Sequence, residues 1–128
     1  MWDMDLAWRE ATSTRERLCL NGLWRWQPSG GAASSVPDEG WGFFKVPGAW
    51  PGITDYMQKD AQRVFAHPAW TNTSLGQVRA AWYERTLVVP PNWNGRRIAL
   101  SIESLNSHAA VFVDGRPLGE IRFPGGEL

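Results

Sequence analysis

Carboxyl groups in the second half of the chain are the first candidates for chemistry. Glu84 and Glu103 fall in segments that resemble neighbouring strands, and Asp114 and Glu120 flank a predicted hairpin turn. Pairs of carboxyl groups catalyse hydrolysis in two arrangements: in one the groups lie about 5 Å apart, and in the other they lie up to about 9 Å apart. In both, one group is kept protonated by its surroundings. Glu84 and Glu103 are explained without catalysis as solvent-exposed strand residues. Asp114 is explained by the turn that it forms. We therefore predict no catalytic residue in this chain.

Other reactive side chains are few. Cys19 is the single cysteine and His67 and His108 are the two histidines, so no cluster has the spacing of a metal site. No Gly-x-Ser-x-Gly segment marks a serine nucleophile, and Gly125-Gly126 lacks the lysine and the spacing of a phosphate-binding loop. The sequence predicts neither a metal nor a cofactor.

The charge balance narrows the classes of partner. Thirteen Lys and Arg residues balance thirteen Asp and Glu residues, which disfavours nucleic acid and anionic membranes as partners. No segment resembles a membrane span, and the N-terminus carries acids where a signal peptide needs basic residues. We expect a protein that is either cytoplasmic or exported with its signal removed.

Two strands are predicted between residues 81 and 103. Residues 81–89 are rich in aromatic and β-branched side chains, and Pro90-Pro91 ends the run. Residues 96–103 alternate between apolar and polar side chains, which predicts one face on a core and the other in water.

A hairpin is predicted directly afterwards. Residues 109–113 form a third strand that ends at Asp114-Gly115, a pair that favours the type I′ turn. Residues 116–119 then return antiparallel.

The first half of the chain is predicted to contribute shorter strands. They cover residues 23–27, 41–46 and 62–66, and end at Pro28, Pro47 and Pro68. Residues 1–17 have no clear period and are expected to form an N-terminal arm, with at most a helical turn at 5–10.

Tryptophan is enriched, with nine in 128 residues, several times an average share. Aromatic rings suit both a packed core and stacking on the C–H face of a sugar. Those inside strand patterns are expected in the core: Trp24, Trp26 and Trp82. Those beside Pro or Asn in loops are expected at a surface or interface as readily as in the core: Trp50, Trp70 and Trp93.

A series of motifs occurs in one order along residues 18–128. They are Leu20-Asn21-Gly22-Leu23-Trp24-Arg25-Trp26, Val46-Pro47-Gly48-Ala49-Trp50, Trp82-Tyr83-Glu84-Arg85, Pro90, Gly95-Arg96-Arg97, Asn106-Ser107, Val111-Phe112-Val113-Asp114-Gly115 and Gly119. The series resembles the N-terminal sugar-binding domain of glycoside hydrolase family 2, the family of the β-galactosidases, β-glucuronidases and β-mannosidases.

The resemblance implies an all-β fold, a jelly-roll β-sandwich of the galactose-binding-domain type, over residues 18–128. In the family a Gly-rich loop, which residues 124–128 resemble, leads into further strands, so the chain is expected to be a fragment that lacks the last strands. An incomplete sandwich leaves an open sheet edge, and we expect a homo-oligomer formed through that edge.

The resemblance also implies an accessory role. In the family the catalytic glutamates lie on a (β/α)₈ barrel, which takes about 250 residues by itself. The expected function is a non-catalytic carbohydrate-binding and scaffold domain, whose partners are a β-glycoside and the catalytic barrel of the parent enzyme. The candidate sugar-facing residues are Asp55, Tyr56, His67, Trp70, Arg122 and Glu127. Packing against a neighbouring domain or exposure to solvent is the alternative for each.

Two other functions stay open at this point. A free-standing carbohydrate-binding module would bind glycans in isolation. A jelly roll that binds only protein would ignore every sugar and respond to a barrel-containing partner.

Overall fold

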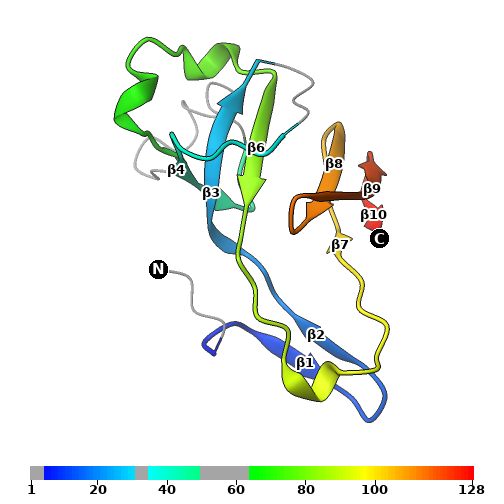
Figure 1. The fold of residues 1–128 in the computed structure, drawn as a ribbon. Coiled ribbons are helices and arrows are strands. Elements are labelled where there is room, and N and C mark those ends of the chain that lie inside the picture. Colours follow the sequence, from blue (N-terminus) through cyan, green and yellow to red (C-terminus); the bar gives the residue numbers. More distant parts are fainter. Residues whose placement is uncertain (1–4, 31–34, 50–63) are drawn as a thin grey trace. The chain divides into compact units, whose positions relative to one another are not determined.

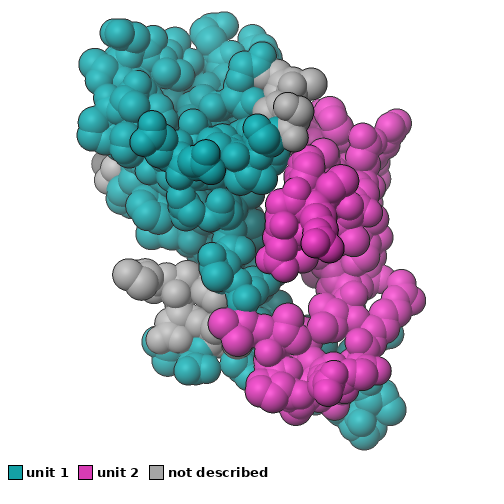
Figure 2. Space-filling model, viewed as in Figure 1, with its two compact units in different colours: residues 1–87 teal, residues 88–128 magenta. Residues whose placement is uncertain are grey.

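The computed structural model describes residues 5–30, 35–49 and 64–128, and the chain divides into a first unit, residues 1–87, and a second unit, residues 88–128 (Figures 1 and 2). The described residues form strands and three short 3₁₀ helices, and every strand pairing is antiparallel. The all-β prediction is confirmed and is consistent with a β-sandwich, whereas the jelly-roll topology stays a prediction. In the described part of the chain, no helix has the length and hydrophobicity needed to cross a membrane.

The predicted N-terminal arm contains a hairpin. Strands β1 (Arg9–Ala11) and β2 (Glu16–Leu18) pair through a turn that begins at Thr12. The Thr12 amide donates to the Arg15 carbonyl at 2.7 Å, and the Arg15 amide donates to the Thr12 hydroxyl at 3.0 Å. The helical turn expected at residues 5–10 is wrong, because strand pairing and this turn satisfy the backbone instead. The boundary between an arm and a sandwich domain stays a prediction.

The main sheet of the first unit has the order β5-β4-β3-β6. Its strands are β3 (Gly22–Ser29), β4 (Gly42–Val46), β5 (Val64–Phe65) and β6 (Ala80–Glu84). Strand β3 does not end at Pro28 as predicted, but at Ser29. Since β4 pairs with residues 22–26, Pro28 has a partner on one side alone among the strands that the structure describes, and a missing N–H donor is tolerated there.

Alternation along β3 and β4 places the core on one face of this sheet. Trp26 and Phe44 are 0% and 1% exposed, and their ring centroids lie 5.7 Å apart. Tyr83 of β6 packs edge to face on both rings. Trp70 and Val78 complete the buried cluster from outside the sheet. Trp82 is only half-buried, because it alternates with Tyr83 and therefore points to the opposite face.

Residues of β6 anchor its end to β3. Glu84 forms an ion pair with Arg25, and the Arg25 guanidinium lies 4.6 Å from the centre of the Trp41 ring. The next residue, Arg85, donates to the Leu23 carbonyl, and burial lowers the pKa of its guanidinium. These contacts give a structural reason for the sequence Glu84-Arg85.

The predicted strand 81–89 is shorter in the structure. It ends at Glu84, and residues 86–89 are exposed and pair with no strand in the described ranges. Apolar composition favoured a strand there, but a strand also needs a neighbouring backbone to pair with.

The second unit is built on the hairpin of β8 (His108–Val113) and β9 (Arg116–Arg122). Asp114 and Gly115 have φ angles of 49° and 73°, so the predicted turn with two positive φ values is confirmed. The register shifts between Val111 and Phe112, where Val111 lies opposite Gly119 and Phe112 opposite Pro117. Leu118 is therefore an extra residue in β9, a β-bulge.

The C-terminal residues pair with an earlier segment of the second unit. Strand β10 (Gly126–Glu127) lies antiparallel to β7 (Ser101–Ile102), and the Leu100 and Leu128 backbones exchange hydrogen bonds of 2.8 and 3.0 Å. A Cβ atom on Gly125 would lie 2.2 Å from the Ile102 carbonyl oxygen, so glycine permits this approach. The loop expected at residues 124–128 is thus partly a strand. The strand expected at 96–103 is reduced to two residues, since residues 96–99 lack a strand partner among the residues described.

Candidate functional site

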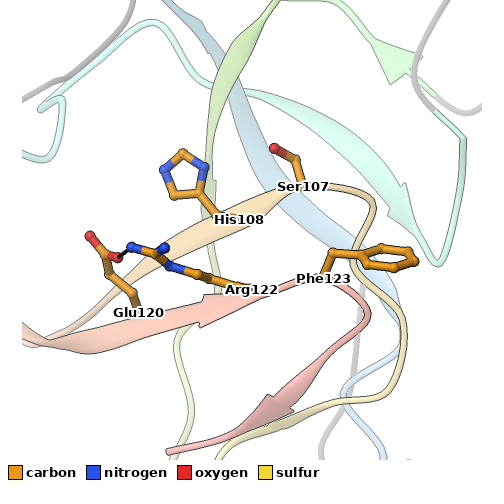
Figure 3. A pocket seen from close by; sticks show the side chains of 5 residues that line it. All are labelled: Ser107, His108, Glu120, Arg122 and Phe123. Carbon is orange, nitrogen blue, oxygen red and sulfur yellow. Dashed lines mark hydrogen bonds and ion pairs between the residues drawn. The ribbon is translucent and has the colours of Figure 1, made fainter.

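The outer face of the β8–β9 hairpin carries a shallow hollow of ≈ 420 Å³ (Figure 3). Its lining residues all belong to the second unit: Ser107, His108, Glu120, Arg122 and Phe123. Four of them are polar and one is aromatic, so the hollow offers hydrogen-bonding groups and, at its other end, an apolar ring.

The strand register explains why the polar side chains share one face. His108 lies directly opposite Arg122, and Ala110 lies opposite Glu120. Because side chains alternate along a strand, Ile121 points to the other face, where it is 3% exposed. The hairpin thus buries Ile121 and presents a polar surface on its outside.

Figure 3 shows the Glu120 and Arg122 head groups beside the His108 ring, whereas the Phe123 ring points away from them at the other end. Arg122 Nη2 donates to Glu120 Oε2 at 3.1 Å, and both side chains are largely open to solvent. The Phe123 amide donates to the Ser107 carbonyl at 2.8 Å, which holds the end of β9 against the start of β8.

These groups suit recognition better than bond cleavage. The guanidinium donates several hydrogen bonds, the carboxylate accepts, and imidazole and hydroxyl groups can do both. Glu120 is the single carboxylate among the described residues that line the hollow, and hydrolysis by two carboxyl groups requires a second one. Within the described part of the chain, no group of three or more His, Cys, Asp or Glu side chains is arranged to hold a metal ion.

The structure places the sequence-predicted sugar-facing residues in different surroundings. Arg122 lines the hollow, and Glu127 is exposed on β10, opposite Ser101. His67 is half-buried, and its Nδ1 accepts from the Ala69 amide at 3.1 Å at the start of the 3₁₀ helix η1 (Pro68–Trp70). Asp55 and Tyr56 lie outside the described residues.

Trp70 belongs to the core of the first unit. Its ring is 8% exposed and meets Trp26 edge to face, and its Nε1 donates to the Gly40 carbonyl at 3.0 Å. Packing accounts for this tryptophan without a ligand.

Four lining residues were not among the sugar-facing candidates predicted from the sequence: Ser107, His108, Glu120 and Phe123. The hairpin turn at Asp114-Gly115 was a usable signal, because it identifies which residues of the two strands face one another. Counting back from the turn without a bulge, however, pairs His108 with Ile121 and hides the polar face.

The other carboxylates considered for catalysis have structural surroundings. Glu84 is paired with Arg25 in the first unit, Asp114 occupies the left-handed turn position, and Glu103 is exposed.

A comparison with curated proteins finds a β-glucuronidase of Paenibacillus borealis that is 31% identical over 104 residues. The match covers 81% of this chain and 16% of the enzyme. The chain is related to glycoside hydrolase family 2. This chain spans only a small part of that relative's length. No protein-family model matches the chain, and no solved structure matches it.

Proposed function

We propose that this chain is the non-catalytic, N-terminal carbohydrate-binding and scaffold domain of a family 2 glycoside hydrolase. The observation that carries the proposal is the match of 81% of the chain to 16% of a β-glucuronidase. A catalytic (β/α)₈ barrel takes about 250 residues, which is more than this chain contains. The related segment is therefore better suited to an accessory domain than to a complete hydrolase.

The surroundings of the carboxylates support the non-catalytic part of the proposal. The Glu84 carboxylate forms an ion pair with Arg25, and the Glu120 carboxylate in the hollow forms one with Arg122. Among the described residues that line the hollow, Glu120 is the single carboxylate, whereas the acid pair of a glycosidase requires two.

The parent protein is proposed to hydrolyse O-glycosyl bonds in carbohydrate metabolism. Its partners would be a β-glycoside, bound partly by this domain, and the catalytic barrel against which the domain packs. The matched enzyme is a β-glucuronidase, so a β-glucuronide is the first substrate to test. A jelly-roll sandwich completed by further strands is the fold proposed for the whole domain.

The coding sequence beyond Leu128 provides the direct test. We expect it to encode further strands and then βα repeats, and we expect the encoded protein to release nitrophenol from an aryl β-glycoside. A complete coding sequence without a barrel would contradict the proposal. A free-standing binding module would then be the better explanation if the chain binds glycans.

A further inference from the structure

We propose that the hollow on the outer face of the β8–β9 hairpin is a sugar subsite that prefers a neutral sugar ring to a uronic acid. This inference rests on the proposed carbohydrate-binding function and adds a location and a ligand class to it. The residues assigned to the subsite are Ser107, His108, Glu120, Arg122 and Phe123.

In the hollow one acceptor group, the Glu120 carboxylate, lies beside one donor group, the Arg122 guanidinium. Glu120 Oε2 accepts from Arg122 Nη2 at 3.1 Å, which leaves Glu120 Oε1 and further guanidinium N–H groups for a ligand. Adjacent hydroxyl groups of a sugar ring each donate and accept, so one can donate to the carboxylate while its neighbour accepts from the guanidinium. Hydrogen bonds to charged groups are stronger than those between neutral groups.

The charges in and around the hollow balance. The positive charge of Arg122 is balanced by Glu120 within the hollow, and residues 88–128 contain four arginines and four acidic residues. A uronate carboxylate would have to displace Glu120 from Arg122, or lie beside Glu120 against like-charge repulsion. A neutral sugar meets neither cost.

The hollow has the size of a ligand pocket, and Phe123 gives it an apolar wall. Its volume of ≈ 420 Å³ lies within the range of about 300–1,000 Å³ that is usual for ligand pockets. Phe123 is 69% exposed and lies at the end opposite to Glu120 (Figure 3). An exposed aromatic ring of this kind provides an apolar surface for the C–H groups of a sugar.

The test is a titration of the 128-residue chain, followed by two-dimensional ¹H–¹⁵N NMR, with methyl β-D-glucopyranoside, methyl β-D-galactopyranoside and methyl β-D-glucuronide. We expect a neutral glycoside to bind more tightly than the glucuronide and to shift the amide signals of residues 107–108 and 120–123.

Two variants separate the chemistry of the hollow from its folding. Glu120→Gln should weaken binding of the neutral glycoside about tenfold, since a hydrogen bond to a charged group is lost. The same change frees Arg122 and should reverse the preference toward the glucuronide. Glu103→Gln removes the same charge from the second unit outside the hollow and should change neither affinity. Far-UV circular dichroism confirms that both variants are folded.

Each other outcome overturns the inference. Tighter binding of the glucuronide by the unaltered chain would refute the neutral preference and leave the carbohydrate role intact. Shifts confined to other residues would refute the location. Absence of binding by all three glycosides would refute the subsite, while glycoside hydrolysis by the encoded parent protein would still decide the proposed function.

Discussion

The indole rings of Trp26 and Trp70 meet edge to face, with their centroids 5.4 Å apart and their planes at 75°. Trp26 lies in the middle of β3, whereas Trp70 ends a single turn of 3₁₀ helix. Edge-to-face aromatic pairs stabilise a core beyond the area that they bury. The contact therefore anchors the segment that connects β5 to β6, residues 66–79, to the sheet.

Replacing Trp70 with alanine should lower the free energy of unfolding by about 3–5 kcal/mol, the usual cost of removing a buried large aromatic ring. The Trp70→Ala variant also loses the hydrogen bond to the Gly40 carbonyl. Urea denaturation followed by far-UV circular dichroism measures the change. Trp8→Ala is the matched control, because Trp8 is 64% exposed and should cost no more than about 0.5 kcal/mol. Equal losses in the two variants would contradict the assigned core.

Gly42 of β4 lies where the sheet meets the Trp70 ring. A Cβ atom there would be 2.3 Å from the Phe65 carbonyl oxygen and 2.6 Å from the Trp70 ring. Gly42→Ala should therefore destabilise the fold by about 1–3 kcal/mol through overpacking. Gly76→Ala is the control, since no atom lies within 4 Å of its added methyl group. Thermal unfolding of both variants gives the comparison, and a neutral Gly42→Ala would show that this packing is wrong.

The ion pair between Glu84 and Arg25 should make a small contribution to stability. Their side chains are 30% and 42% exposed, so solvent screens the charges and a coupling of about 0.2–1 kcal/mol is expected. A double-mutant cycle with Glu84→Gln and Arg25→Met measures the coupling directly. The coupling should fall as salt is added. A zero coupling at low salt would mean that the pair does not form in solution.

Local sequence signals were sufficient for some elements and not for others. Asp114-Gly115 identified the hairpin because positive φ at two successive positions is a local requirement. Trp26 was expected in the core because large aromatic side chains inside strands are mostly buried. Trp70 was ambiguous, because its burial depends on a partner 44 positions earlier in the chain.

The site could be predicted only in part. Arg122 was selected through a family resemblance, but its neighbours depend on the bulge at Leu118, which no local composition signals. If the same sequence paired without a bulge, Ile121 instead of Arg122 would lie opposite His108, and every side chain of β9 beyond Leu118 would exchange faces. Strand β10 was missed because the family resemblance implied a Gly-rich loop at residues 124–128, whereas Gly125 permits close approach to Ile102.

Deletion of Leu118 tests the bulge. Since Leu118 is the extra residue between the Phe112–Pro117 and Val111–Gly119 pairs, its removal should restore a regular ladder and keep Ile121, now 3% exposed, on the buried face. The deletion should therefore lower the free energy of unfolding by no more than about 1 kcal/mol. Leu118→Ser keeps the length of β9 and, at a position 52% exposed, should cost about 0.5 kcal/mol or less. Chemical denaturation measures both variants, and a loss on deletion as large as that of Trp70→Ala would show that Leu118 is not the extra residue.

The most direct test of the accessory role is to incubate the purified 128-residue chain with a panel of nitrophenyl β-glycosides that includes the glucuronide, galactoside and mannoside. We expect no nitrophenol above the buffer blank at any chain concentration, because Glu84 and Glu120 are ion-paired with arginines and a catalytic barrel of about 250 residues exceeds the length of this chain. Release of nitrophenol in proportion to the amount of chain would contradict the non-catalytic role.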